Sequence, residues 1–421
     1  GDMAFDSKNY HSGVLLLEHM LANPVDEGEP SQSKKRRAVV ADVDEDGKTA
    51  ARHQEVWFQL ARLYKELGEE DVVLSLYKKY ANCTYTKSAV ASTLRGDFLG
   101  ALNTYYAALD HDADGKPWEG KPPTLKEVDF WDDERLECCH QLADWNLLHE
   151  NVLAQFDGDA SKVWSADEMY LRHYICSASK INKERDNLFR FVEQGMANEE
   201  HRKRLEAHHS ADLALVYSQF GDPAKAKFYL KKMHLRFLEQ WSQLPPLAKG
   251  PRLKLLQSLQ KMVEIEEFLK VHPDTALFDT TLPINASGLR TDDSRPSQEW
   301  DELLERSHKL LAVWANRFPS RLDPVNVWDD ILVGRAFSLQ QLQNGMRQRL
   351  EVLETRTNRR DSKRQASMEA LEAEITLSCI AAYQRGASTM AKAGNHPVAE
   401  AYLEKSDILA ESPSLQRPVK L

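Results

Sequence analysis

The chain has 421 residues, of which 42% are hydrophobic, and a formal net charge of −10. This acidic balance argues against a generic nucleic-acid-binding protein, because neutralising phosphates needs clustered cations. The five cysteines lack Cys-x-x-Cys spacing, so they indicate neither a disulfide framework nor a Cys-rich zinc site and fit a reducing intracellular compartment. No stretch approaches the roughly 20 apolar residues of a membrane span, and the N-terminal residues do not resemble a signal peptide. We therefore expect a soluble protein, and the abrupt start suggests a piece of a longer chain.

The pattern of apolar residues predicts an all-α chain. Gly and Pro are sparse, at 18 and 17, and alternating β-branched runs are nearly absent. A helical hairpin is clearest between Trp57 and Tyr77, where Gly68 ends the first helix and Val73 lies one turn before Tyr77 on the second. Four residues of the first helix lie at positions i, i+3, i+4 and i+7 and so share one face: Trp57, Leu60, Ala61 and Tyr64.

Similar turns recur along the chain, each followed by a helix with a small residue and an aromatic or Leu on one face. The further copies have their turns at Asn9-Tyr10, Gly96-Asp97, Ala143-Asp144, Gly221-Asp222 and Gly394-Asn395. A single such turn is equally explained as a plain helix end, but the repetition resembles a tetratricopeptide array, whose period is about 34 residues. Because the spacing here is uneven, we predict an irregular α-solenoid of tetratricopeptide-like hairpins with inserted helices.

Changes in composition divide the chain into five parts. We predict a partial helical hairpin at 1–23, a disordered acidic and basic insert at 24–52, a helical-repeat solenoid at 53–271, a loop at 272–296 and a continuation of the repeats at 297–421. The insert contains the run Lys34-Lys35-Arg36-Arg37, which is either a nuclear localisation signal or a solvated charge run.

Several helix ends have recognisable capping residues. Thr124 and Glu127 form a possible capping box, Ser297 suits a helix cap, and Asp323-Pro324 suits a cap followed by a first helical position. The polar stretch Thr355–Gln365 is expected to be an exposed helix end or loop. Two apolar stripes are predicted to be buried: Leu303, Leu304, Leu310, Leu311, Trp314 and Phe318, and then Trp328, Ile331, Leu332, Leu339, Leu342 and Met346.

No catalytic motif is evident. The chain has no Gly-rich phosphate loop, no His-Glu-x-x-His and no Gly-x-Ser-x-Gly. His201, His208 and His209 lie in a strongly charged stretch, and adjacent histidines point about 100° apart on a helix, so an exposed polar face is favoured over a metal site. We assign no catalytic, cofactor-binding or metal-ligating residue and expect no cofactor.

Three short motifs superficially suggest chemistry. Asp97-Phe98-Leu99-Gly100 has one residue too many for the Asp-Phe-Gly of protein kinases, and in a repeated turn Asp97 is expected to cap a helix. Trp131-Asp132-Asp133 and Trp328-Asp329-Asp330 pair carboxylates beside an indole, but packing and capping by solvated acids near a helix start is favoured over acid/base catalysis. The main aromatics are expected in the core rather than on a base-stacking platform: Trp57, Tyr64, Tyr105, Trp145, Trp314 and Trp328.

Four blocks of sequence resemble the FAT region of the phosphatidylinositol-3-kinase-related kinases, in particular of a DNA-dependent member of that family. They are Val56–Lys79, Asp129–Leu148, Pro251–Leu269 and, most specifically, Leu310–Leu339 with its Asp-Pro-x-Asn-x-Trp-Asp-Asp-Ile. The resemblance runs from about Trp57 to Leu339. It implies a helical-repeat solenoid that clasps the kinase domain of a nuclear DNA-dependent Ser/Thr protein kinase in double-strand-break repair by non-homologous end joining.

The same resemblance implies partners and limits. The kinase domain and remaining solenoid of the parent chain would be direct partners, whereas the Ku heterodimer and DNA ends would bind through other parts of it. No membrane contact and no direct nucleic-acid binding by this segment are expected. The family's kinase motifs, ATP site and FATC element do not occur in these residues, so this chain itself is not expected to be an enzyme.

The alternative is a free-standing tetratricopeptide-type adaptor that binds peptides or partner proteins. A carboxylate-binding groove would present Asn, Lys and Arg on successive first helices. Here those positions are mostly apolar or aromatic, as at Leu60, Tyr64, Leu213 and Tyr217. The kinase scaffold is therefore favoured, and an independent enzyme would require a site assembled from distant residues.

Overall fold

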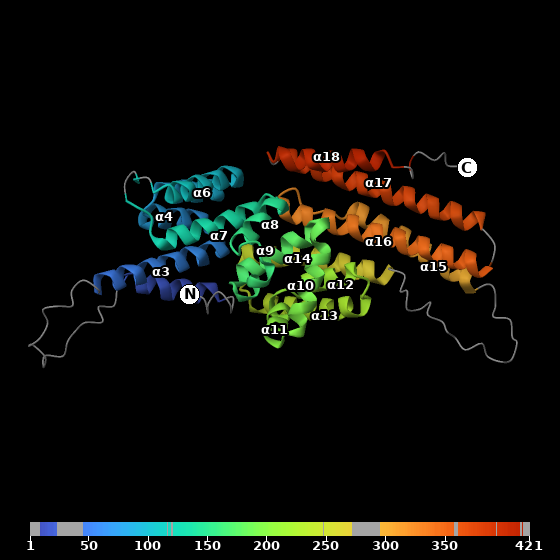
Figure 1. Cartoon of the computed structure of the whole chain (residues 1–421), viewed down its shortest axis with the longest axis horizontal. Coiled ribbons are helices and arrows are strands. Elements are labelled where there is room, and N and C mark those ends of the chain that lie inside the picture. Colours follow the sequence, from blue (N-terminus) through green and yellow to red (C-terminus); the bar gives the residue numbers. More distant parts are fainter. Residues whose placement is uncertain are drawn as a thin grey trace, which may run out of the picture. The chain divides into compact units, whose positions relative to one another are not determined.

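The computed structural model describes residues 9–22, 45–271, 295–412 and 415, apart from 116, 119, 120, 247, 358–360 and 393, and it excludes the side chains of 45–52, 295–299, 356 and 357. All secondary-structure elements within these residues are helices, and many of them pack against the next helix in the chain (Figure 1). The predicted all-α solenoid is confirmed. The chain divides into two compact units, one of Gly1–Gln141 with Arg236–Leu256 and one of Leu142–Leu235 with Gln257–Leu421.

The first unit is built from a series of short helical hairpins. Its helices are α2 (Tyr10–Ala22), α3 (Glu45–Leu67), α4 (Glu70–Tyr80), α5 (Thr84–Leu94), α6 (Phe98–Ala113) and α7 (Leu125–Gln141). The predicted capping box is present at the start of α7: the Glu127 N–H donates to Thr124 Oγ1 over 3.3 Å, and the Thr124 N–H donates to Glu127 Oε2 over 3.1 Å.

The second unit combines short helices with long ones. The short elements are α8 (Trp145–Ala154), η1 (Ala160–Ser165), α9 (Glu168–Lys180), η2 (Asn182–Glu184), α10 (Arg185–Ala197), α11 (Glu199–His208) and α12 (Ser210–Gln219). The later helices are α15 (Arg295–Asn316), α16 (Val325–Thr357), α17 (Ser362–Lys392) and α18 (His396–Ala410), with α17 and α18 side by side (Figure 1). Two helices contribute residues to both units: α13 (Pro223–Gln243) and α14 (Lys249–Val271).

Four of the predicted repeat turns share one geometry. A residue with positive φ ends a helix, at Gly96 (78°), Ala143 (57°), Gly221 (72°) and Gly394 (80°). The Asp or Asn that follows accepts, through its side chain, the N–H of the residue three positions later: Asp97 from Gly100, Asp144 from Leu147, Asp222 from Lys225 and Asn395 from Val398. The Asp97 prediction is thus confirmed, and the turn both ends one helix and starts the next.

Some predicted helix ends are shifted. α3 begins at Glu45, so the helix starts inside the segment 24–52 that was predicted to be disordered, and the acidic Glu45 and Asp46 suit a helix start. α15 begins at Arg295, which places Ser297 within the helix rather than at its cap. α16 begins at Val325, directly after Pro324, and the Asp323 carboxylate accepts the Ser320 N–H in the preceding turn. Lys34–Arg37 and most of the 272–296 loop lie outside the described residues.

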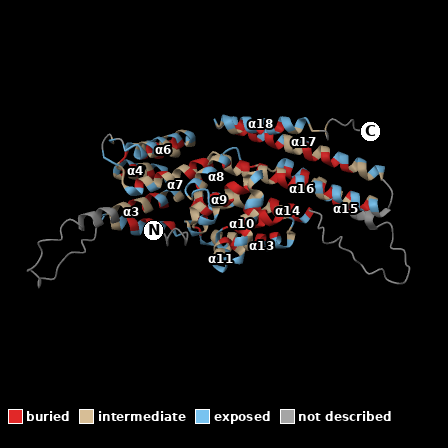
Figure 2. Ribbon diagram, viewed as in Figure 1, coloured by how far each residue is buried: buried red, intermediate tan, exposed pale blue. Residues whose placement is uncertain are grey.

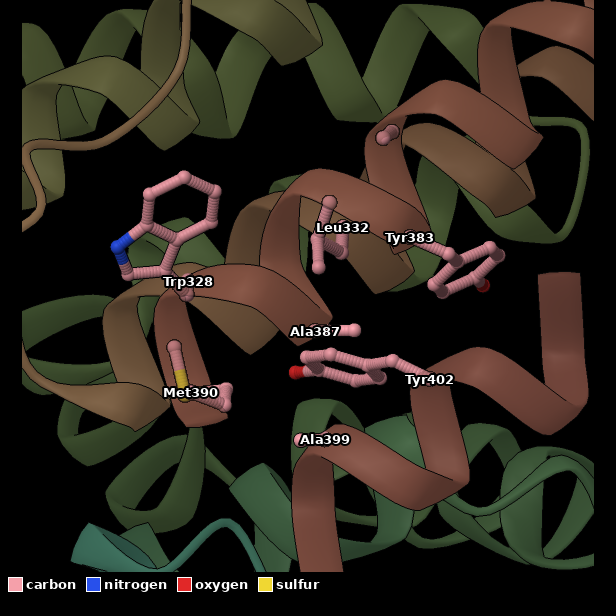
Figure 3. Close-up of a cluster of buried hydrophobic side chains, with 8 residues drawn as sticks. Trp328, Leu332, Tyr383, Ala387, Met390, Ala399 and Tyr402 are labelled. Carbon is pink, nitrogen blue, oxygen red and sulfur yellow. The ribbon is translucent and has the colours of Figure 1, made fainter. Parts of the chain in front are cut away.

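The predicted core faces are largely buried (Figure 2). All six residues named on α16 are buried, whereas Leu304 on α15 and Phe318, just after that helix, are only partly buried. In the second unit, one cluster joins α16, α17 and α18, and Figure 3 shows the Tyr402 ring between Ala387 and Ala399. α17 approaches closely there because Gly386 has no side chain; a Cβ at that position would lie 2.6 Å from Leu332 Cδ1.

Candidate functional site: a buried charge network

The most distinctive feature of the second unit is a buried carboxylate that joins four helices. Asp329, on the second turn of α16, is 4% exposed. Its Oδ2 accepts from Trp145 Nε1 on α8 and its Oδ1 from the Tyr402 hydroxyl on α18, both over 2.7 Å, and Lys180 Nζ on α9 lies 3.9 Å from Oδ2. Burial and the Asp329 charge both raise the pKa of Tyr402, so its hydroxyl remains a proton donor.

Asp330 extends the network to two further helices. Its carboxylate pairs with Lys180 and lies 3.7 Å from Lys261 Nζ on α14, and Lys261 Nζ lies 3.6 Å from Asp212 on α12. Burial alone would lower the pKa of Lys261, but the Asp330 and Asp212 carboxylates outweigh it and raise the pKa above its ordinary value. Lys261 is therefore charged and holds two carboxylates together.

A histidine continues the network toward the start of α9. His209, 2% exposed between α11 and α12, places Nδ1 3.4 Å from Asp212 Oδ2 and Nε2 2.6 Å from Glu168 Oε1. Burial disfavours the charged forms of His209 and Glu168, but their hydrogen bonds and opposite charges outweigh it. The pKa of His209 is raised, and hydrogen bonds from His209 and Arg204 lower the pKa of Glu168 to about 2. Arg204 also donates to the backbone oxygens of Trp164 and Ala166.

Taken together, the network is electrically balanced. It contains four carboxylates and, with His209 protonated, four cations: Asp212, Asp329, Asp330 and Glu168, with Lys180, Arg204, Lys261 and His209. Asp329 and the Lys180 ammonium are buried, and removing one partner of such a buried pair costs about 3–5 kcal/mol because a charge is left uncompensated, whereas partly exposed members such as Glu168 and Asp330 contribute less. The arrangement suits a structural role, since each carboxylate already holds a cation or a hydrogen-bond donor.

A second buried ion pair joins α14, α15 and α16. The Arg335 guanidinium donates to both Glu264 oxygens, over 2.9 and 2.7 Å, and to the Trp314 and Arg317 carbonyls. Its cationic carbon lies 4.9 Å from the centre of the Phe318 ring. The three helices are thereby fixed by one side chain.

The space beside these groups is small. A cavity of about 20 Å³, lined in part by Lys180, Lys261, Glu264 and Asp330, has room for about one water molecule. That is far below the several hundred Å³ of a typical cofactor pocket. Within the described parts of the chain, no group of three or more His, Cys, Asp or Glu is placed to hold a metal ion.

The sequence analysis assigned no functional site, and two residues of the network lie in surroundings other than those predicted. Asp329 was expected to be a solvated acid near a helix start and His209 to lie on an exposed polar face, and both predictions are wrong because each side chain is covered by helices distant in sequence. His208 is exposed, and His201 stacks 4.5 Å from the Trp164 ring. One local signal was Lys180, the cation within the otherwise uncharged run 174–181.

The other motifs behave as predicted. Trp131 is fully buried and its Nε1 donates to Thr86 Oγ1 over 2.9 Å, while Asp132 pairs with Arg135. Of the aromatics predicted for the core, all are buried except Tyr64, which is partly exposed and donates its hydroxyl to Glu18. Among the described helices, none is both long and apolar enough to cross a membrane.

Comparison with known sequences places the chain in a family. The sequence model of the FAT domain matches residues 159–418, more than half of the chain, and so covers every residue of the charge network. The chain belongs to the FAT domain family. The family-model match reaches residue 418, whereas the resemblance noted in the sequence ended at Leu339.

Individual relatives fit this assignment. The chain is 30% identical over 345 residues to the DNA-dependent protein kinase catalytic subunit of Gallus gallus and 29% identical over 344 residues to that of Canis lupus familiaris, matches that each cover 79% of this chain. It is also 23% identical over 285 residues, 68% of the chain, to the SAGA complex/NuA4 acetyltransferase complex subunit TRA1 of Saccharomyces cerevisiae. The matches span only 8%, 7% and 7% of those relatives' own lengths.

Proposed function

We propose that this chain is a noncatalytic helical scaffold segment of a nuclear, DNA-dependent Ser/Thr protein kinase, and that it clasps and regulates the kinase domain in double-strand-break repair by non-homologous end joining. The FAT domain match over 159–418 and the names of the relatives support the class of protein. The kinase domain and the remaining solenoid are its direct partners. The Ku heterodimer and DNA ends bind through other parts of the parent chain, and the segment needs no cofactor.

The observation that carries the proposal is the span of the charge network. Asp329 accepts hydrogen bonds from Trp145 at the start of the second unit and from Tyr402 in its last helix. Packed cores and interfaces tend to switch between discrete arrangements rather than deform continuously. A unit whose first and last helices share one buried carboxylate therefore moves as a body, and strain applied at one end reaches the other.

The test uses the full-length parent protein. Replacing Asp329 by Asn keeps the shape and removes the charge, and we expect DNA- and Ku-stimulated phosphorylation of a peptide substrate to fall at least about fivefold, the usual scale of allosteric coupling. Recruitment to Ku-bound DNA ends should persist. Asp301→Asn, at an exposed position of α15, is the control. Full stimulation in the Asp329 variant would contradict regulation through this unit.

A second candidate has its own support. The TRA1 relative is named as a subunit of acetyltransferase complexes, which favours a scaffold that assembles partner proteins without phosphorylating them. The alternative of a free-standing tetratricopeptide-type adaptor likewise describes a protein that binds partners without phosphorylating them. A native full-length product that contains this segment but no kinase domain would favour it, whereas phosphorylation that depends on residues 57–339 would favour the kinase scaffold.

A further inference from the structure

The part of α13 in the second unit, Pro223–Leu235, has an unusual exposed face. Its buried side is formed by Ala226, Tyr229 and Leu230, and Tyr229 stacks on Tyr217 with ring centres 5.5 Å apart. On the opposite side Phe228 and Leu235, seven residues apart, are 52% and 53% exposed. Two bulky apolar side chains at this spacing lie on one stripe of the helix, as in the seam between two packed helices.

The charge of this helix segment is opposite to that of the whole chain. Pro223–Leu235 contains four lysines and no carboxylate, within a chain of net charge −10. Lys225 pairs with Glu193 and Asp222, and Lys232 pairs with Glu206 over 2.6 Å. Lys231 differs: it is exposed between Phe228 and Leu235, and no carboxylate of the described residues lies within ion-pair distance of it.

We propose that this face, called here the α13 stripe and defined by Phe228, Lys231 and Leu235, docks an acidic amphipathic helix of a partner protein. Apolar side chains of the partner at i and i+7 would cover Phe228 and Leu235, and a carboxylate beside them would pair with Lys231. The partner is thus recognised by apolar contact and by a negative charge at one fixed position.

An anionic membrane is the less suitable occupant. Helices that lie in a membrane surface bury their apolar face about 5–10 Å deep. Phe228 and Leu235 are each only about half exposed, and α13 is held against α10 and α11 by Lys225–Glu193 and Lys232–Glu206. The stripe can cover a facing helix without leaving these contacts, but it has too little free apolar surface to insert.

The test is a charge swap with the whole chain. The probes are three synthetic helical peptides of about 20 residues, long enough to form helix in isolation: one with Leu at heptad positions flanked by Glu, one with Lys in place of every Glu, and one with Ser in place of every Leu. Fluorescence anisotropy should show that the chain binds the Glu peptide at least about fivefold more tightly than the other two. Lys231→Glu should reverse the preference between the Glu and Lys peptides.

Controls separate the stripe from general surface effects. Leu235→Ser should weaken binding of the Glu peptide, whereas Leu377→Ser and Lys392→Glu, at exposed positions of α17, should leave it unchanged. Circular dichroism confirms that each variant is folded. Absence of binding to the Glu peptide, or binding that Lys231→Glu does not alter, overturns the proposal. Binding to phosphatidylserine-containing vesicles that is lost in the Lys231 and Leu235 variants also overturns it, in favour of a membrane surface.

Discussion

Both units bury a carboxylate between helices, but the groups that stabilise this carboxylate differ between the two units. In the first unit Glu127 is fully buried, and its Oε1 accepts from the backbone N–H groups of Asn82 and Cys83 and from the Thr86 hydroxyl, over 3.0, 3.1 and 3.1 Å. All of these donors are neutral. In the second unit Asp329 lies beside charged Lys180 and at the centre of a network of ion pairs.

The reach of the two carboxylates also differs. The donors to Glu127 lie 41 to 45 residues before it in the chain, within the neighbouring hairpins. The bond from Trp145 to Asp329 joins residues 184 positions apart. The neutral hydrogen bonds to Glu127 stabilise one junction between neighbouring hairpins. The ion pairs and hydrogen bonds around Asp329 connect several helices that are far apart in the sequence. The second unit should therefore respond more strongly to the loss of one side chain and to pH.

The largest expected effect is that of Asp329→Ala. The change leaves Lys180 without one of its two carboxylates and removes the acceptor of Trp145 and Tyr402, so the free energy of unfolding should fall by about 3–5 kcal/mol. Urea unfolding gives the change in stability, and hydrogen exchange should show opening in α8 and α18. Asp301→Ala is the matched control. A loss below about 1 kcal/mol would mean that the network contributes no more than a surface ion pair.

A glycine in each unit allows the packing to be compared as well. A Cβ at Gly195 in the second unit would lie 2.4 Å from the Trp164 ring, which stacks on Phe191 and His201 with ring centres 4.2 and 4.5 Å away and so resists displacement. Gly195→Ala should cost up to about 3 kcal/mol in thermal or urea unfolding. At Gly250 in the first unit the nearest atom is the Glu66 carbonyl oxygen, 3.2 Å away, and a smaller loss is expected.

Gly334 on α16 provides the control for that experiment. No atom lies within 4 Å of a Cβ built there, so Gly334→Ala should raise stability by up to about 1 kcal/mol through helix propensity alone. If Gly195→Ala were as harmless as Gly334→Ala, the close packing of Trp164 on α10 would be wrong.

A smaller loss is expected for Glu127→Gln in the first unit. The amide keeps one oxygen acceptor but places a donor opposite the Thr124 N–H, so the capping box is broken and the free energy of unfolding should fall by about 1–2 kcal/mol. Urea unfolding and hydrogen exchange at the start of α7 measure it. A cost equal to that of Asp329→Ala would refute the contrast between neutral and ionic surroundings.

The sequence predicted what depends on neighbouring residues. Helical periodicity identified the buried face of α16 from Trp328 to Met346, and Gly followed by Asp or Asn located the turns at Gly96, Gly221 and Gly394, since both signals are local. The environment of Asp329 was not predictable in this way. Its partners are brought to it by folding from far along the chain, so the acid could not be distinguished from a solvated one.

The smallest effect is a pH dependence confined to the second unit. Because the pKa of His209 is raised above 6.5 in the folded chain, its stabilising contribution is fully present below the unfolded value and is lost as pH rises through the folded pKa. The lowered pKa of His149 acts oppositely, since its contribution is lost as pH falls. The measurement is therefore the difference between the parent chain and His209→Gln in urea unfolding from acidic to alkaline pH. The difference should be largest on the acidic side and shrink above neutrality, and a constant difference would show that His209 is uncharged in the network.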